Sequence, residues 1–359
     1  MWKTIQLLSM TVLTIAFLSL VTGCYSTVVP ERTETSFIEK GPIPASPSNE
    51  ASTRPSVQYQ LTYVSECGKE SECVYAVDVD CLETNYPCLG KPQLMFAVKK
   101  SGDGPNPPVI SLDWSPNGNQ VVIEAAGMAG QSDIFIGDLE GQTWTNLTKS
   151  SNYEGSPKWS SSGDTISYLG KSSKPENSLH AYSVTTDGRS DKQLLPLLDP
   201  SFSEINSFSW SPGGNRIVFT HSDINGYYQL FVANPDGSGL KQLTEQKEDH
   251  YDPVFSPTGE WILYRQQPRS AEMISDLYVI QPDGKNEKAV TKDSSIWKGG
   301  QSWYPNGNWI AYVAKTQESS GDFKIQSEIN LIKSDGTNPI VLTEEGKNGY
   351  SPVWRIKSP

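Results

Sequence analysis

The chain has 359 residues, of which 36% are hydrophobic and 19% charged, with 29 Gly, 25 Pro and 10 Trp. This amount of Gly and Pro excludes a coiled coil, and it lies well below the levels of a collagen or a wholly disordered chain. The 29 Lys and Arg stand against 41 Asp and Glu, which gives a net charge of −12 without any Lys/Arg-rich run, so we expect no nucleic-acid partner.

Residues 1–23 have the features of an export signal. Lys3 supplies a positive charge, and the 17 residues from Ile5 to Val21 include no charged side chain. As a helix this run would span ~25 Å, which is short for a bilayer crossing and typical of a signal-peptide core. The small residues before Cys24 resemble a bacterial lipobox, which implies acylation of Cys24 and cleavage just before it. The alternatives are an ordinary signal peptide and an uncleaved anchor.

The lipobox resemblance implies a protein held by lipid on the cell membrane or outer membrane, facing the periplasm or the exterior. Residues 24–56 are rich in Ser, Thr, Pro and Glu with few large apolar side chains, so they cannot bury enough surface to become ordered. We therefore expect a signal peptide at 1–23, a lipidated Cys with a disordered tether at 24–56, and one folded domain at 57–359.

A repeat of 45 to 51 residues organises that domain. Each copy has an aromatic residue, a Gly four residues later, a second turn that ends in Gly, and a Leu or Val six residues beyond that, usually followed by Thr. Strand-like runs separate these turns, so each copy predicts four short antiparallel strands, which is the blade of a β-propeller. The aromatic residues are Trp114, Trp159, Trp210, Phe255, Trp303 and Trp354.

The repeated W-S-P-x-G, x-D-G and L-T segments are similar to the signature of the TolB-like family of propeller repeats, a WD40-like repeat. The resemblance extends over roughly residues 109–356. It implies an all-β propeller of four-stranded antiparallel blades, and it implies much less about function.

Six blades are expected. The five complete copies leave Tyr350 to Ile356 as a first strand with nothing after it, while strand-like segments at Gln58 to Ser65, Val74 to Asp80 and Gln93 to Val98 precede the first copy. If the C-terminal strand pairs with these N-terminal strands, a sixth blade closes the ring and removes the free sheet edges. The alternative is an open arc of five blades with a separate N-terminal hairpin.

Four cysteines lie in that composite blade: Cys67, Cys73, Cys81 and Cys88. An exported location permits disulfides, and four cysteines allow three connectivities. The local pairs 67–73 and 81–88 are the simplest, because each pair flanks a predicted turn. The spacing is not that of a C-x-x-C pair, so we expect neither a metal site nor a catalytic role, and no cofactor.

The loops that vary in length are the expected binding face. With strands a to d in each blade, the a–b and c–d turns are uniform, while the b–c and d–a loops vary, and Arg265 to Ser275 and Lys315 to Gln326 are long b–c loops. Binding tends to lie on variable loops over a rigid scaffold, and aromatics beside carboxylates suit a peptide or a sugar. The candidate ligand-binding residues are Tyr153, Glu154, Glu204, His250, Asp252, Trp297, Lys298 and Tyr350.

The alternative for each candidate is a solvated loop residue or an aromatic ring that packs over a neighbouring blade. The repeated strand-a Trp residues, in contrast, are expected to pack between blades, because every copy places them identically.

Two classes of function fit this pattern. The first, which we favour, is a non-catalytic, monomeric, lipid-anchored module that binds an envelope protein, peptide or polysaccharide. The second is a propeller-type glycan lyase or glycosidase, which needs paired carboxylates or a His/Glu metal cluster at the channel mouth. His221 and His250, with Glu204 or Asp252, are the residues for it, and two histidines with scattered acids are a weak pattern.

The repeats are also similar to those that precede the hydrolase domain of prolyl-oligopeptidase-like peptidases. The sequence has no G-x-S-x-G motif, and five residues follow Trp354. We therefore expect no such peptidase domain after the propeller.

Overall fold

The computed structural model describes most of the compact unit Pro55–Pro359, and within it the architecture is entirely β. The described residues are 58–68, 71–79, 90–99, 105–127, 131–139, 142–171, 178–196, 198, 204–270, 274–293, 296–317, 325–343 and 348–357. They form six four-stranded antiparallel sheets, which confirms the predicted all-β propeller. Within these ranges, no helix has the length and apolarity that a bilayer crossing requires.

Each sheet is one blade, and its strands a to d follow in chain order. Blade 1 comprises β4 (Asn106–Trp114), β5 (Gln120–Ala126), β6 (Ser132–Asp138) and β7 (Trp144–Asn146). Blade 2 comprises β8 (Glu154–Trp159), β9 (Thr165–Lys171), β10 (Leu179–Thr185) and β11 (Asp191–Gln193). Blade 3 comprises β12 (Ser207–Trp210), β13 (Ile217–Ser222), β14 (Tyr228–Ala233) and β15 (Lys241–Gln242). Blade 4 comprises β16 (Asp249–Phe255), β17 (Ile262–Gln267), β18 (Asp276–Ile280) and β19 (Lys288–Ala289). Blade 5 comprises β20 (Trp297–Trp303), β21 (Trp309–Gln317), β22 (Ile325–Lys333) and β23 (Ile340–Val341).

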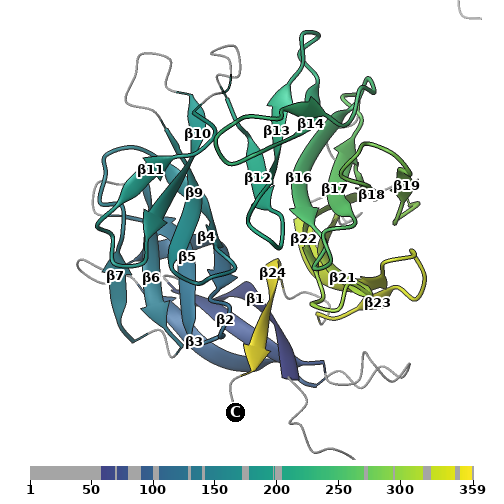
Figure 1. The fold of residues 1–359 in the computed structure, drawn as a ribbon. Coiled ribbons are helices and arrows are strands. Elements are labelled where there is room, and N and C mark those ends of the chain that lie inside the picture. Colours follow the sequence, from purple (N-terminus) through teal and green to yellow (C-terminus); the bar gives the residue numbers. More distant parts are fainter. Residues whose placement is uncertain are drawn as a thin grey trace, which may run out of the picture. The chain divides into compact units, whose positions relative to one another are not determined.

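The sixth blade is built from both ends of the domain. It comprises β24 (Tyr350–Lys357), β1 (Gln58–Gly68), β2 (Ser71–Asp78) and β3 (Gln93–Lys99). Strand β24 pairs antiparallel with β1, so that Trp354 lies opposite Leu61, and Figure 1 shows the yellow β24 beside the purple β1. The predicted closure of the ring is confirmed.

A disulfide joins Cys67 and Cys73 across the turn between β1 and β2, with their Cα atoms 5.7 Å apart. This confirms one of the two predicted local pairs. Cys81, Cys88 and the predicted lipidation site Cys24 lie outside the described residues.

The repeated aromatic residues pack between each blade and the preceding one, as predicted. The indole Nε1 of Trp114 in blade 1 donates to Thr62 Oγ1 of blade 6 at 2.8 Å. In blade 3, Trp210 donates in the same way to Ser167 Oγ of blade 2, also at 2.8 Å. An indole ring whose N–H is hydrogen-bonded stabilises the fold by burying apolar surface, and the hydrogen bond fixes the orientation of the ring. This position therefore serves the scaffold.

The other repeated residues also have structural tasks. The Thr of the L-T pair accepts the amide proton of a strand-c residue, for example Thr244 Oγ1 from Leu230 N at 3.0 Å. The Gly of the c–d turn docks on the preceding blade, since a Cβ at Gly336 would lie 2.5 Å from the carbonyl oxygen of Val290. Gly336 also has a φ of +85°, which a side chain disfavours.

A bulge recurs in strand a, three residues before the aromatic. Four of the blades place a residue with a φ of 54 to 58° there: Ser156, Asp252, Gly300 and Ser351. The Asp252 amide donates to Ser207 Oγ of blade 3 at 3.0 Å, so the bulge turns a backbone donor from its own sheet toward the neighbouring blade.

Deletion of residues 351–359 is expected to abolish the cooperative thermal unfolding transition, measured by near-UV circular dichroism. The deletion removes the strand that joins blades 5 and 6 and with it Trp354, a residue 8% exposed; loss of one large buried aromatic alone costs about 3–5 kcal/mol. Deletion of residues 358–359 leaves β24 intact and serves as the control. Unchanged melting of the longer deletion would contradict closure by β24.

Gly336→Ala is expected to lower the free energy of unfolding by about 3 kcal/mol, because a strained φ adds about 1–2 kcal/mol to the clash with Val290. Gly307→Ala is the matched control: Gly307 has a φ of +79°, and a Cβ there meets no atom within 4 Å among the described residues. Urea denaturation of both variants measures the difference in their free energies of unfolding. Equal losses of stability would show that the positive φ, and not the clash with Val290, causes them.

Candidate functional site

A cluster of aromatic rings around one guanidinium lies at the end of blade 4 that carries the d–a and b–c loops. The Arg265 guanidinium, on β17, lies 4.4 Å from the ring centroid of Tyr251 and 5.4 Å from that of Trp297. Its Nε donates to Asp252 Oδ2 at 3.2 Å. The Nζ of Lys315 lies 4.4 Å from the Trp297 centroid. We call these five residues the Arg265 cluster.

A second arginine ties blade 4 to blade 3. Arg269 Nε donates to Asp249 Oδ2 at 2.8 Å, and its guanidinium lies 4.2 Å from the Tyr227 ring centroid. Its Nη2 also donates to the carbonyl oxygen of Gly226. The two b–c connections are therefore joined by a cation–π contact and a hydrogen bond to a backbone carbonyl, while the ion pair with Asp249 holds Arg269 to its own blade.

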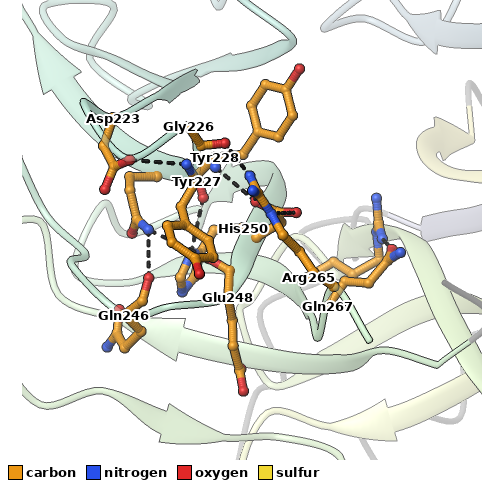
Figure 2. A network of polar contacts seen from close by, with 12 residues as sticks. Asp223, Gly226, Tyr227, Tyr228, Gln246, Glu248, His250, Arg265 and Gln267 are labelled. Carbon is orange, nitrogen blue, oxygen red and sulfur yellow. Dashed lines mark hydrogen bonds and ion pairs between the residues drawn. The ribbon is translucent and has the colours of Figure 1, made fainter. Parts of the chain in front are cut away.

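The turn that Arg269 holds presents an apolar residue. Asp223 Oδ1 accepts the amide protons of Asn225 at 2.8 Å and Tyr227 at 2.9 Å, and Gly226 N donates to Asp223 O at 2.9 Å. Figure 2 shows Asp223, Gly226, Tyr227 and Tyr228 in this network, with Arg265 and Gln267 nearby. Ile224 at the tip is 101% exposed, so a braced turn holds an isoleucine in solvent.

Three groups of this region, Tyr228, Tyr251 and Arg269, have a raised pKa. Burial, reinforced by the Asp249 carboxylate, raises the pKa of Tyr251 to about 12. Burial also raises the pKa of Tyr228, while the hydrogen bond to Asp249 raises the pKa of Arg269. The site therefore offers neutral phenols and permanent cations, which suit stacking and hydrogen bonding rather than proton transfer.

Three of the predicted ligand-binding residues occupy one equivalent position, five residues before the repeated aromatic. Glu154, His250 and Lys298 are 6%, 0% and 3% exposed, respectively. Each faces strand c of the preceding blade. His250 Nδ1 donates to the Tyr228 carbonyl at 3.1 Å, and Lys298 Nζ pairs with Asp276 Oδ1 at 3.0 Å. The position thus lies inside the blade junction.

Glu154 is the least compensated of the three. Burial raises its pKa to about 7, against hydrogen bonds from Ser150 and Thr148 that lower it, and the carboxylate of Asp133 raises it further. Oε2 of Glu154 and Oδ1 of Asp133 are buried without a hydrogen-bond partner among the described residues. Two adjacent buried carboxyls favour keeping a proton on one of them.

The remaining predicted residues form two pairs and one single residue. Asp252 and Trp297 both belong to the Arg265 cluster. Tyr153 and Tyr350 are partly buried, and their hydroxyls bond to Glu124 and Glu72, respectively. Burial and these carboxylates raise the pKa of both phenols. Glu204 is exposed on the d–a loop before β12.

Sequence reasoning did not single out Arg265, Tyr251, Arg269 or Ile224 as binding residues. A signal was present, because Arg265 and Arg269 fall within the segment 265–275 that the sequence predicts to be a long b–c loop, and Ile224 is an apolar residue inside a D-x-N-G turn.

The histidines and acids do not gather into a metal centre. His250 packs against Tyr264 with ring centroids 5.5 Å apart, while His221 packs against Phe231 at 6.1 Å. Burial lowers the pKa of His250. Across the part of the chain that the structure describes, no group of three or more His, Cys, Asp or Glu residues could hold a metal ion.

The raised pKa of Glu154 predicts a pH dependence of stability. Folded Glu154 keeps its proton up to about pH 7, whereas an unfolded glutamate releases it near 4.5. The free energy of unfolding should therefore fall as the pH rises from about 5 to 8. In Glu154→Gln this fall should shrink by about 3 kcal/mol, since the pKa rises from 4.5 to about 7 on folding and each pKa unit equals about 1.4 kcal/mol.

Urea denaturation at several pH values measures this effect. Glu245→Gln, at an exposed position, is the control and should keep the slope of the unmodified protein. An unchanged slope in Glu154→Gln would contradict the assignment.

Comparison with known proteins finds relatives of this propeller. Residues 106–267 match the family model PD40, described as the TolB beta propeller domain. An uncharacterized peptidase, YuxL, of Bacillus subtilis is 24% identical over 218 residues, which cover 48% of this chain and 32% of that protein. Dipeptidyl-peptidase 5 of Porphyromonas endodontalis is 30% identical over 129 residues, 34% of this chain and 18% of that protein. The chain thus spans about a third or less of these relatives.

Two solved structures share the fold. TolB from Acinetobacter baumannii superposes with a TM-score of 0.63 at 17% identity, covering 83% of this chain and 67% of that one. A TolB-related protein from Agrobacterium tumefaciens gives a TM-score of 0.55 at 14% identity, covering 85% and 100%. The six closed blades thus share the fold of these TolB structures, and residues 106–267 match the TolB beta propeller domain model.

Proposed function

We propose that the protein is a non-catalytic binding module, anchored by lipid outside the cytoplasm, that engages a protein, peptide or polymer of the cell envelope through the loop face of blades 3 to 5. The observation that carries the proposal is the braced turn that presents Ile224 beside the Arg265 cluster.

Single exposed apolar residues are common on protein surfaces, so exposure alone does not argue for binding. Ile224 differs because its turn is held by a hydrogen bond that the Asp223 carboxylate accepts from Asn225 N and by one that Arg269 donates to Gly226 O. A residue that is fixed before binding loses little conformational entropy when a partner covers it.

The residue types around this turn are those that dominate interface energetics. Tyr227, Tyr251, Trp297 and two arginines lie within the two linked groups described above. Trp, Tyr and Arg are the side chains most enriched among energetically dominant interface residues. An acid–base enzyme would instead need titrating groups with free access to substrate, and the perturbed Glu154 lies within a blade junction.

Two features support an exported location. The apolar run before Cys24 favours export and lipidation, and the Cys67–Cys73 disulfide is typical of proteins that fold in an oxidising compartment. A lipid anchor would hold this acidic protein at a membrane without a basic surface.

Affinity capture from envelope extracts of the source cells, with the biotinylated protein as bait, tests the proposal. We expect Ile224→Asp to reduce the amount of the main cross-linked partner at least tenfold, because a buried carboxylate without a counter-charge is strongly unfavourable. Val341→Asp, at a residue 57% exposed on β23, is the matched control and should capture as the unmodified protein does.

Equal capture by both variants would contradict the assigned face. Turnover of an acidic polysaccharide by the purified protein would contradict the non-catalytic role and favour the glycan-active alternative.

A further inference from the structure

The a–b and c–d turns form the opposite face of the propeller. Each a–b turn normally rests on the equivalent turn of the preceding blade. A Cβ at Gly163 would lie 3.4 Å from Pro116, and one at Gly259 would lie 3.5 Å from Pro212. These contacts close the surface between neighbouring blades.

Between blades 4 and 5 this contact is open. A Cβ at Gly307 meets no atom within 4 Å in the part of the chain that the structure describes. A hollow of about 210 Å³ occupies the junction, with Val279 and the buried Trp303 among its lining residues. Its polar lining includes Thr258, Glu260, Lys288, Asn306, Asn308 and Ser334.

Trp261 forms one wall of this hollow and departs from the repeat. The equivalent residue in blades 1, 2 and 3 is Gln120, Thr165 and Arg216, respectively. In blade 5 it is Trp309, which is buried, whereas Trp261 is only partly buried. The Nζ of the exposed Lys288 lies 4.4 Å from the Trp261 ring centroid. An indole at this place, beside an open hollow, is not required by the repeat.

A second, broader hollow of about 640 Å³ shares this wall. It is lined by Trp261 and Glu260 together with Arg216, Lys241, Gln281, Pro282 and Asp283. Trp261 and Glu260 therefore stand between two hollows, one toward blade 5 and the other toward blade 3. The volume of the smaller hollow lies below the ~300–1,000 Å³ typical of pockets that enclose drug-sized ligands, so this hollow suits one ring-sized group. The broader hollow has room for the groups that follow that ring in a chain.

The lining chemistry fits a neutral sugar. Hydroxyl and carboxamide groups both donate and accept hydrogen bonds, as sugar hydroxyls do; Asn306 Oδ1 accepts the Asn308 amide at 2.9 Å, which leaves the Asn306 side-chain N–H groups to donate. One carboxylate, Glu260, and one ammonium, Lys288, give the smaller hollow no net charge. A peptide ligand would instead favour apolar anchor pockets or a free strand edge.

We propose that the two hollows on either side of Trp261 form a binding site for a neutral oligosaccharide, with one sugar ring against the indole and Asn306 and the chain continuing toward Lys241. The site lies on the face opposite the Arg265 cluster and Ile224, so it is independent of the function proposed above.

Fluorine NMR of the full folded domain labelled with 5-fluorotryptophan tests the site. Trp261→Gln assigns the Trp261 resonance and introduces the residue that blade 1 has at the same place. The probes are tetra-N-acetylchitotetraose and maltotetraose. We expect at least one probe to shift the Trp261 resonance saturably with a Kd of about 1 mM or tighter and to leave most other tryptophan resonances in place.

Calorimetric titration of variants completes the experiment. Trp261→Gln and Asn306→Ala should each weaken binding at least tenfold, whereas Gln120→Ala, at the exposed equivalent position in blade 1, should not change it. Two outcomes would overturn the proposal: no shift of Trp261 with either probe up to about 20 mM, or a shift that appears only with a tetrapeptide probe. Thermal melting of each variant verifies that it folds.

Discussion

The pairing of β24 with β1 is the interaction on which the structure depends. It places Trp354 opposite Leu61 and joins the last segment of the domain to the first. The a–b turn of blade 1 then docks on β24, where a Cβ at Gly118 would lie 2.2 Å from the carbonyl oxygen of Ile356. Without this seam, blades 5 and 6 would each expose an apolar flank, because a blade buries its side chains only against its neighbours.

Ring closure also limits which polar residues can serve a ligand. The side chain five residues before each repeated aromatic enters the junction with the preceding blade, whether it is apolar, as Ile205, or ionisable, as Lys298. An ionisable residue there needs a partner in the junction, and Asp276 supplies it for Lys298. Glu154 meets Asp133 instead, so the same position produces an ion pair in one junction and a glutamate with a raised pKa in another.

The fold could be predicted from the sequence because its turns need particular residues: Gly336 combines a positive φ with a close backbone approach, and such Gly residues recur at fixed spacing. The candidate site was only partly predictable. Trp297 and Lys298 are adjacent in β20, and neighbours in a strand point to opposite faces, so only one of them could join the Arg265 cluster. The partner of the buried Lys298 lies on the preceding blade. How two blades are aligned with each other cannot be read from a pattern in a single sequence.

Departures from a repeat separate binding surface from scaffold more sharply than residue type does. The repeated Trp114 and Trp210 donate hydrogen bonds to neighbouring blades, whereas Trp261 stands where blades 1 to 3 have polar residues and adjoins a hollow. Ile224 likewise stands in a turn without an equivalent in the repeat signature. Because every junction must satisfy the same packing geometry, a side chain that this geometry does not require is free to be selected for contact with another molecule.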